Sequence, residues 1–256
     1  MDWQEISGNW VLIPPARPVA IVHFLGGAFV ATAPHLTYRW LLEELAQAGY
    51  VIIATPFINT FDHIEIARSV LHTFEKACDR LHATSTFRRR YIPIYGMGHS
   101  MGCKLHLLIG SLFPVERSGN IFMSFNNYAA RDAIPLLDQF SQFSDSFTVE
   151  FTPSPTETKQ IIAKDYQIRR NLLIKFSDDN IDQTNALTTL LEKRFPDMIT
   201  SKMLNGNHLT PLNQDIKWSV GTAFSPIDAI SQWFKQEIFK DLYKLKKEIL
   251  LWLNCV

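Results

Sequence analysis

The sequence predicts an α/β protein in which helices cover both faces of a mostly parallel central sheet. Short apolar runs of β type alternate with segments of helical apolar spacing along most of the chain, as in βαβ units. The chain has 256 residues, 46% of them hydrophobic, so it can bury the core of a full domain. A third observation is a glycine-flanked serine at one strand-to-helix junction. We therefore expect residues 1–256 to form a single domain of this class.

Each predicted element follows from its apolar spacing and from the residues that end it. The helix over residues 38–48 places leucines at helical spacing and stops at Gly49, a residue type that commonly ends helices. Residues 64–81 show the same spacing over a longer stretch. The predicted strands are Val19–Phe24, Tyr50–Ala54, a run around Ile92–Tyr95, Asn120–Phe125, Leu172–Phe176 and Thr200–Leu204, and the helices are Tyr38–Ala48, Ile64–Leu81, the stretch after Ser100 and Thr184–Phe195.

Two regions depart from this simple alternation. Residues 126–170 are too long for a plain crossover between strands, although Thr152–Glu157 carries a strong helix-start signal. Because loops of this length in compact domains are usually functional, we predict a cap over the site, with a surface connection as the alternative. The C-terminal stretch 226–253 carries an apolar helical stripe that we expect to pack against the sheet. Its lysines could also favour weak contact with a membrane surface or a partner.

The pentapeptide Gly98-His99-Ser100-Met101-Gly102 has the pattern of a nucleophile elbow. In such an elbow the serine is at the apex of a sharp turn between a strand and a helix, and small residues two positions away avoid a clash with the neighbouring backbone. The amide of Met101 would lie in the first turn of the helix, where it can bind a developing oxyanion. The strand-like residues before the motif and the helical spacing after it favour Ser100 as a nucleophile.

A serine nucleophile needs a base, and the base needs a carboxylate to orient it. In folds with this elbow the acid and then the histidine follow the serine along the chain, each on a loop after a strand. Of the eight histidines only two follow Ser100, and one of these, His106, lies within the helix of the elbow. This leaves His208, which follows a short predicted strand, as the candidate base.

The acid is expected in the turn after the strand 172–176, where three carboxylates compete. An acid about four residues beyond the apolar core of the strand would be Asp179. We favour Asp179 over Asp178 and place Asp182 third. The residues not used by the site would belong to a solvated turn with local capping hydrogen bonds.

The loop after the first predicted strand offers donors for an oxyanion. The run from Val22 to Phe29 resembles the glycine-rich loop of esterases, in which backbone amides face the substrate carbonyl. We predict an oxyanion hole from Gly27, Met101 and Gly26, with Gly27 as the first choice. His23, in the same run, is expected to be a core histidine.

Charge and cysteine content exclude several other classes of function. Twenty-five basic and 25 acidic residues give no net charge, which argues against a nucleic-acid binder. The three cysteines and the scattered histidines lack metal-ligand spacing, so no metal, cofactor or disulfide framework is expected. No stretch reaches the roughly 18 apolar residues of an integral membrane segment, and the start lacks a signal sequence. We therefore expect a cytoplasmic protein.

Four runs of the sequence, His23–Phe29, Thr60–His63, Gly98–Ser111 and Ser124–Tyr128, resemble a family of α/β-hydrolase-like proteins of cyanobacteria and plastids. That family is known only as a domain of unknown function, and the resemblance covers essentially the whole chain. It implies an α/β-hydrolase fold, and a cyanobacterial cytosol or a plastid stroma as the setting. It implies no particular substrate.

These observations lead to three hypotheses of function. The first is a serine hydrolase that cleaves an ester or thioester with an apolar acyl group, so that its partner is a small ester or lipid-like molecule. The second is a catalytically silent protein that binds a lipid or a protein partner on the same scaffold. The third is an acyltransferase, which would pass the acyl group to an alcohol instead of water.

Overall fold

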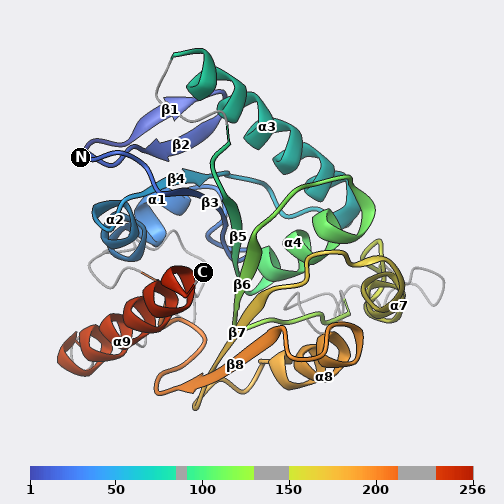
Figure 1. Cartoon of the computed structure of the whole chain (residues 1–256). Coiled ribbons are helices and arrows are strands. Elements are labelled where there is room, and N and C mark those ends of the chain that lie inside the picture. The colour runs from blue at the N-terminus through green and yellow to red at the C-terminus, as the bar shows by residue number, and fades with distance from the viewer. Residues whose placement is uncertain (85–90, 130–149, 213–234, 256) are drawn as a thin grey trace, which may run out of the picture.

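The structure, a computed structural model, describes residues 1–84, 91–129, 150–212 and 235–255. Within these residues one sheet of eight strands runs through the molecule in the order β1-β2-β4-β3-β5-β6-β7-β8 (Figure 1). The strands are β1 (Gln4–Ile6), β2 (Asn9–Leu12), β3 (Ala20–Leu25), β4 (Tyr50–Ala54), β5 (Ile94–His99), β6 (Gly119–Met123), β7 (Asn171–Phe176) and β8 (Ile199–Leu204).

The sheet is parallel from β4 to β8, and only the N-terminal strands β1 and β2 pair antiparallel. The prediction of a mostly parallel sheet is therefore confirmed. The β1–β2 hairpin was not predicted, because strands of three and four residues are too short to show a period. Its position depends on pairing with β4, where Trp10 lies opposite Ala54.

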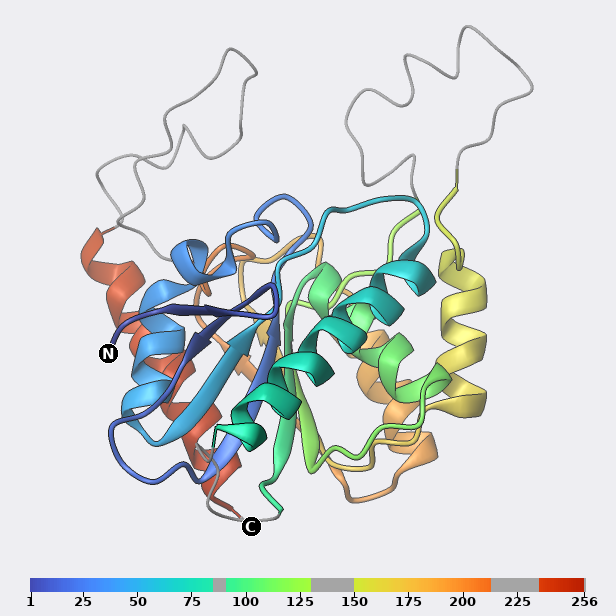
Figure 2. The same ribbon diagram turned by 90° about the horizontal axis from the view of Figure 1, so that it is seen from above.

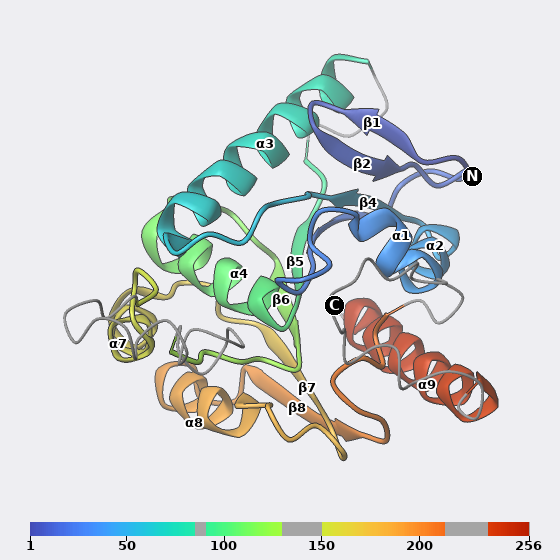
Figure 3. The ribbon, with the colours of Figure 1, turned by 180° about the vertical axis from the view of Figure 1, so that it is seen from behind.

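Helices cover both faces of the sheet, as the alternation predicted. Buried residues of α2 and α9 pack on one face, where Figure 3 shows the two helices side by side. On the other face α3 and α4 form one apolar cluster, and α4, α7 and α8 form another (Figure 2). The helices are α1 (Pro34–Thr37), α2 (Arg39–Gln47), α3 (His63–Ala83), α4 (Met101–Leu112), α7 (Pro155–Asp165), α8 (Thr184–Arg194) and α9 (Lys235–Asn254).

The C-terminal helix α9 buries the stripe expected of it. Leu242, Leu245, Ile249 and Leu253 are each 3% exposed or less and lie in the same cluster as the sheet residues of that face. The lysine on its polar side that approaches the body of the protein, Lys246, forms an ion pair with Glu44 at 2.7 Å. The predicted residues 226–234 lie outside the described part of the chain. No helix among the described residues is long and apolar enough to cross a membrane.

The region predicted as a cap is described only in part. Its helix-start signal is confirmed, because Ser154 and Glu157 form a reciprocal capping box at the start of α7. Helix α7 lies beside α4 and α8 in the layer that covers the sheet. Residues 130–149 lie outside the described part of the chain, so a cap over Ser100 stays a prediction for that segment.

Candidate active site

The turn between β5 and α4 places Ser100 at the carboxyl edge of the parallel sheet. Ser100 has a φ of 55° and a ψ of −119°, a backbone conformation that costs energy for a non-glycine residue. The turn is crowded, since a Cβ on Gly102 would lie 2.1 Å from the carbonyl oxygen of Leu25. A Cβ on Gly98 would lie 2.6 Å from the amide nitrogen of Cys103. Both flanking positions of the motif therefore need glycine, for a steric reason.

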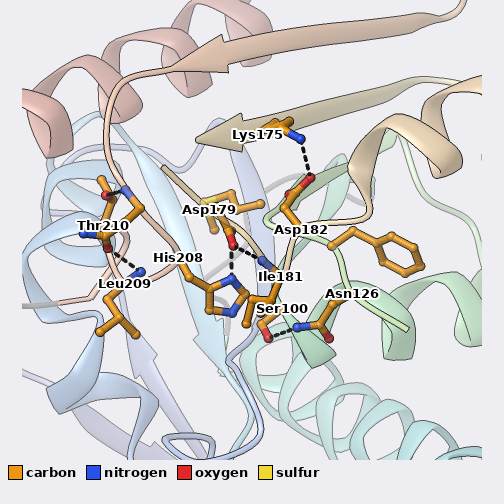
Figure 4. A network of polar contacts seen from close by, with 12 residues as sticks. Ser100, Asn126, Lys175, Asp179, Ile181, Asp182, His208, Leu209 and Thr210 are labelled. Carbon is orange, nitrogen blue, oxygen red and sulfur yellow. Dashed lines mark hydrogen bonds and ion pairs between the residues drawn. The ribbon is translucent and has the colours of Figure 1, made fainter. Parts of the chain in front are cut away.

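His208 and Asp179 form a hydrogen-bonded pair next to this turn. The ring nitrogen Nδ1 of His208 lies 2.8 Å from Oδ2 of Asp179, and the Asp179 side chain is fully buried. Figure 4 shows the ring of His208 between the carboxylate of Asp179 and the hydroxyl of Ser100. No hydrogen bond joins His208 to Ser100 among the described residues.

Two loops that follow neighbouring strands bring this pair together. Asp179 follows β7, and His208 follows β8, which runs parallel to β7. The amide of Asp178 donates to the carbonyl of Gly206 at 2.9 Å, which ties the two loops to each other. Gly206 has a φ of 121°, which a residue with a side chain rarely adopts. The loop geometry therefore depends on a glycine two residues before His208.

The three candidate carboxylates have different partners. Asp182 accepts hydrogen bonds from the amide and hydroxyl of Thr184, at 2.9 and 2.7 Å, where helix α8 begins. Lys175 Nζ lies 3.7 Å from Asp182 Oδ1. Asp178 is exposed. Among the three, Asp179 is the carboxylate that contacts His208.

The environment of Asp179 favours its charged form. Burial by itself would raise the pKa of this carboxyl, but the hydrogen bond and charge of His208 together with the amide of Ile181 lower the pKa instead. The amide of Ile181 donates to Asp179 Oδ1 at 3.1 Å, so both carboxylate oxygens are engaged. A carboxylate held in this way keeps the His208 ring in one orientation, with the proton on Nδ1.

The glycine loop after β3 packs against Tyr38. The amide of Gly27, our first choice as an oxyanion donor, donates to the hydroxyl of Tyr38 at 2.9 Å. A Cβ on Gly26 would lie 2.9 Å from the Tyr38 ring, so the loop packs directly on that residue. The amide of Gly27 is therefore engaged within the protein, whereas the next amide, that of Ala28, has no hydrogen-bond partner among the described residues. The amide of Met101 lies at the start of α4, where it has no intrahelical partner.

Sequence reasoning missed a side chain that contacts the candidate nucleophile. Asn126 Nδ2 donates to Ser100 Oγ at 3.1 Å from the segment that follows β6 (Figure 4). Because β6 is the parallel neighbour of β5, the segment after it must reach the same edge of the sheet. The position of Asn126 just beyond the predicted strand 120–125 was the available signal.

Two further histidines, His23 and His106, are buried in the core. His23 is fully buried, with Nε2 lying 3.1 Å from the hydroxyl of Thr55, so its expected core position is confirmed. Burial, followed by the nearby Arg117, lowers the pKa of His23 well below its usual value. His106 is also buried, and its Nε2 lies 3.2 Å from the carbonyl oxygen of Met97.

Comparison with known proteins gives a family and a fold. The family described as "Protein of unknown function (DUF1350)" matches residues 2–255. No curated protein matches the sequence. Among solved structures, a soluble variant of monoglyceride lipase from Saccharomyces cerevisiae is similar with a TM-score of 0.62 at 15% identity, covering 99% of this chain and 94% of that one.

Two further structures show the same architecture. A highly thermostable carboxyl esterase from Bacillus coagulans has a TM-score of 0.55 at 12% identity, and the match covers 96% of this chain and 93% of the esterase. The thioesterase domain from the curacin biosynthetic pathway has a TM-score of 0.51 at 13% identity, with 82% and 94% covered. The chain therefore has the α/β-hydrolase fold.

Proposed function

Since the chain belongs to DUF1350, a family described as of unknown function, we propose its reaction from the site itself: hydrolysis of a carboxylic ester or thioester by a serine nucleophile. The observation that carries the proposal is the hydrogen bond of 2.8 Å between His208 and Asp179, with the His208 ring beside the elbow serine. A buried carboxylate, an imidazole and a serine at an elbow are the groups that acyl transfer through a serine requires.

In this reaction Ser100 Oγ attacks the carbonyl carbon of the substrate while Nε2 of His208 takes the hydroxyl proton. Asp179 holds the ring and stabilises the imidazolium that forms. His208 then protonates the leaving group. In the second half of the reaction a water molecule attacks the acyl carbon, and His208 returns a proton to Ser100 Oγ as the acid leaves. Water can attack because His208, once neutral again, can accept its proton.

For the oxyanion we propose the amides of Met101 and Ala28 as donors. Both are supported by the lack of a competing partner among the described residues, and the Met101 amide also benefits from the positive end of the α4 dipole. Gly27, by contrast, would have to break its hydrogen bond to Tyr38 in order to donate. Gly26 supports the loop by letting it approach the Tyr38 ring.

Asn126 is proposed to hold the Ser100 hydroxyl with its proton directed away from the amide and toward His208. We expect Asn126→Ala to slow ester hydrolysis about 3- to 10-fold, the worth of one hydrogen bond of about 0.5–1.5 kcal/mol. Asn127→Ala is the matched control, because Asn127 donates to the carbonyl of Pro155 at 2.9 Å and not to Ser100. Steady-state rates at saturating ester would test this; equal losses in the two variants would count against a role for Asn126.

An apolar acyl group is the substrate that the surroundings of Ser100 favour. Phe29, Ile58 and Ile181 are 79%, 73% and 46% exposed and lie on loops that follow β3, β4 and β7, at the edge of the sheet that carries Ser100. Exposed side chains of this size at one edge are typical of a surface that binds an apolar ligand. The similarity to a lipase and an esterase is consistent with such substrates, but at this level of identity it shows only the fold.

A panel of esters that differ only in acyl length, from acetyl to dodecanoyl, tests the proposed reaction. We expect hydrolysis with kcat/KM at least about 10-fold higher for the preferred longer chain than for acetyl, because each added methylene in an apolar site is worth about 1–3 kcal/mol. Transfer of the acyl group to an added alcohol in preference to water would instead indicate an acyltransferase. Binding of the esters with no turnover would indicate a silent hydrolase-like protein.

A further inference from the structure

We propose that Tyr38 and His99 are positioning residues that join the oxyanion side of the site to the backbone of His208. This inference rests on the proposed hydrolase function and names residues that support it without touching substrate. The sequence did not indicate this role for either residue. Tyr38 is the first residue of a predicted helix, and His99 occupies the variable position before the serine of the motif.

Three short contacts make one continuous chain through the core beneath Ser100. The amide of Gly27 donates to Tyr38 Oη at 2.9 Å, and Tyr38 Oη lies 2.7 Å from Nδ1 of His99. On the other side of the ring, Nε2 of His99 lies 2.8 Å from the carbonyl oxygen of His208. This chain of contacts therefore runs from the loop after β3, through the last residue of β5, to the loop after β8.

With the His99 ring neutral, only one arrangement of protons satisfies all three contacts. The carbonyl of His208 can only accept, so Nε2 of His99 must carry the proton and Nδ1 must accept. Tyr38 therefore donates its hydroxyl proton to His99 and accepts from the amide of Gly27. Each donor has one acceptor, and a single hydroxyl group connects the two loops.

Burial makes this arrangement permanent over the ordinary pH range. Tyr38 is fully buried and His99 is 2% exposed. Burial, followed by the neighbouring His208, lowers the pKa of His99 to about 3, so the ring stays neutral. Burial likewise raises the pKa of the Tyr38 hydroxyl, which therefore keeps its proton. In the buried core the loss of one partner leaves the others unsatisfied, which is costly.

The contacts fix the two parts of the site that must face each other across Ser100. By holding the amide of Gly27 inward, Tyr38 leaves the following amide, Ala28, to face the substrate. By holding the carbonyl of His208, His99 sets the backbone from which that side chain reaches Asp179 and Ser100. Because His99 directly precedes Ser100, the nucleophile shares the same support.

The test is Tyr38→Phe, which removes only the shared hydroxyl. We expect kcat for the preferred ester to fall about 10- to 100-fold with KM changed less than about 3-fold, because a misplaced donor or base affects the transition state more than binding. Amide hydrogen exchange in residues 207–212 should also speed up, since the loop loses its anchor. This second measurement does not depend on catalysis.

Tyr166→Phe is the matched control. Tyr166 is also fully buried, and its hydroxyl makes two hydrogen bonds, to Asn171 Oδ1 at 2.7 Å and from Asn120 Nδ2 at 2.8 Å. It lies in the cluster of α4, α7 and α8, away from the His208 loop. A general effect of losing a buried hydroxyl would lower the stability of both variants, whereas the loss of kcat and the faster exchange at 207–212 should appear in Tyr38→Phe alone.

His99→Phe and the double variant Tyr38→Phe/His99→Phe complete the experiment. If the two residues are coupled, the fold-loss of kcat in the double variant should be smaller than the product of the two single losses, while independent roles would give additive free-energy losses. Wild-type kcat and wild-type exchange in Tyr38→Phe would overturn the proposal. If the wild type hydrolyses no ester and reacts with no fluorophosphonate, the proposed function fails, and exchange at 207–212 still decides whether the chain of contacts holds the loop.

Discussion

Ser100→Ala is expected to abolish labelling by a fluorophosphonate probe and to remove nearly all ester hydrolysis. The probe reacts only with a serine that is activated by a base and faces an oxyanion site, and the alanine has no nucleophile to offer. Removal of the serine of a triad leaves residual catalysis, so we expect a loss of about 10⁴-fold or more in kcat. Hydrolysis of the preferred ester and the intact mass of the labelled protein measure the two effects.

A serine on α4, the helix that follows the Ser100 turn, provides the control. Ser111 is buried and its hydroxyl donates to the carbonyl of Leu107 at 2.7 Å, so Ser111→Ala removes a buried hydroxyl from α4 without touching the site. It should keep full labelling and nearly full activity. Labelling that persists in Ser100→Ala, or that is lost equally in Ser111→Ala, would remove Ser100 from the role of nucleophile.

Asp179→Asn and His208→Ala are expected to have the second-largest effects. An asparagine can donate a hydrogen bond to Nδ1 and so favours the wrong tautomer of His208, while alanine removes the base altogether. We expect each change to lower kcat by about 10³- to 10⁴-fold with little change in KM, because the lost interactions act on the transition state. The variants should remain folded, since the loops are also held by the hydrogen bond from the Asp178 amide to Gly206.

Asp178→Asn and Asp182→Asn are the controls on the acid. The Asp178 side chain is exposed, so its variant should have wild-type kinetics. Asp182 holds the first turn of α8 through Thr184, so Asp182→Asn should cost about 1 kcal/mol of stability and leave kcat within a few-fold of wild type. A loss of about 10³-fold in Asp178→Asn with full activity in Asp179→Asn would mean that the acid lies one residue earlier.

Local sequence was sufficient for most of the regular structure. The strand Tyr50–Ala54 and the helix from Thr184 were predicted within one residue of their observed ends, because apolar periodicity and terminating residues act over a few neighbouring positions. The least accurate strand was the one before the elbow, predicted around Ile92–Tyr95 and found at Ile94–His99. Its glycines lower β-propensity. Gly96 is needed because two side chains distant in sequence approach it: a Cβ would lie 2.3 Å from the amide oxygen of Asn120 and 2.8 Å from Nδ1 of His106.

The sequence by itself determined the elements, the crowded serine turn and the short list of candidate groups, because each depends on the chain within a few residues of itself. It left three carboxylates open, preferred the amide of Gly27 and did not find Asn126, Tyr38 or the link through His99. The contacts at those residues depend on tertiary structure, because the loops after β3, β5, β6, β7 and β8 converge at one edge of a parallel sheet. Hydrogen bonds near 3 Å between residues far apart in the sequence form because these loops converge. No local pattern in the chain predicts which residues they join.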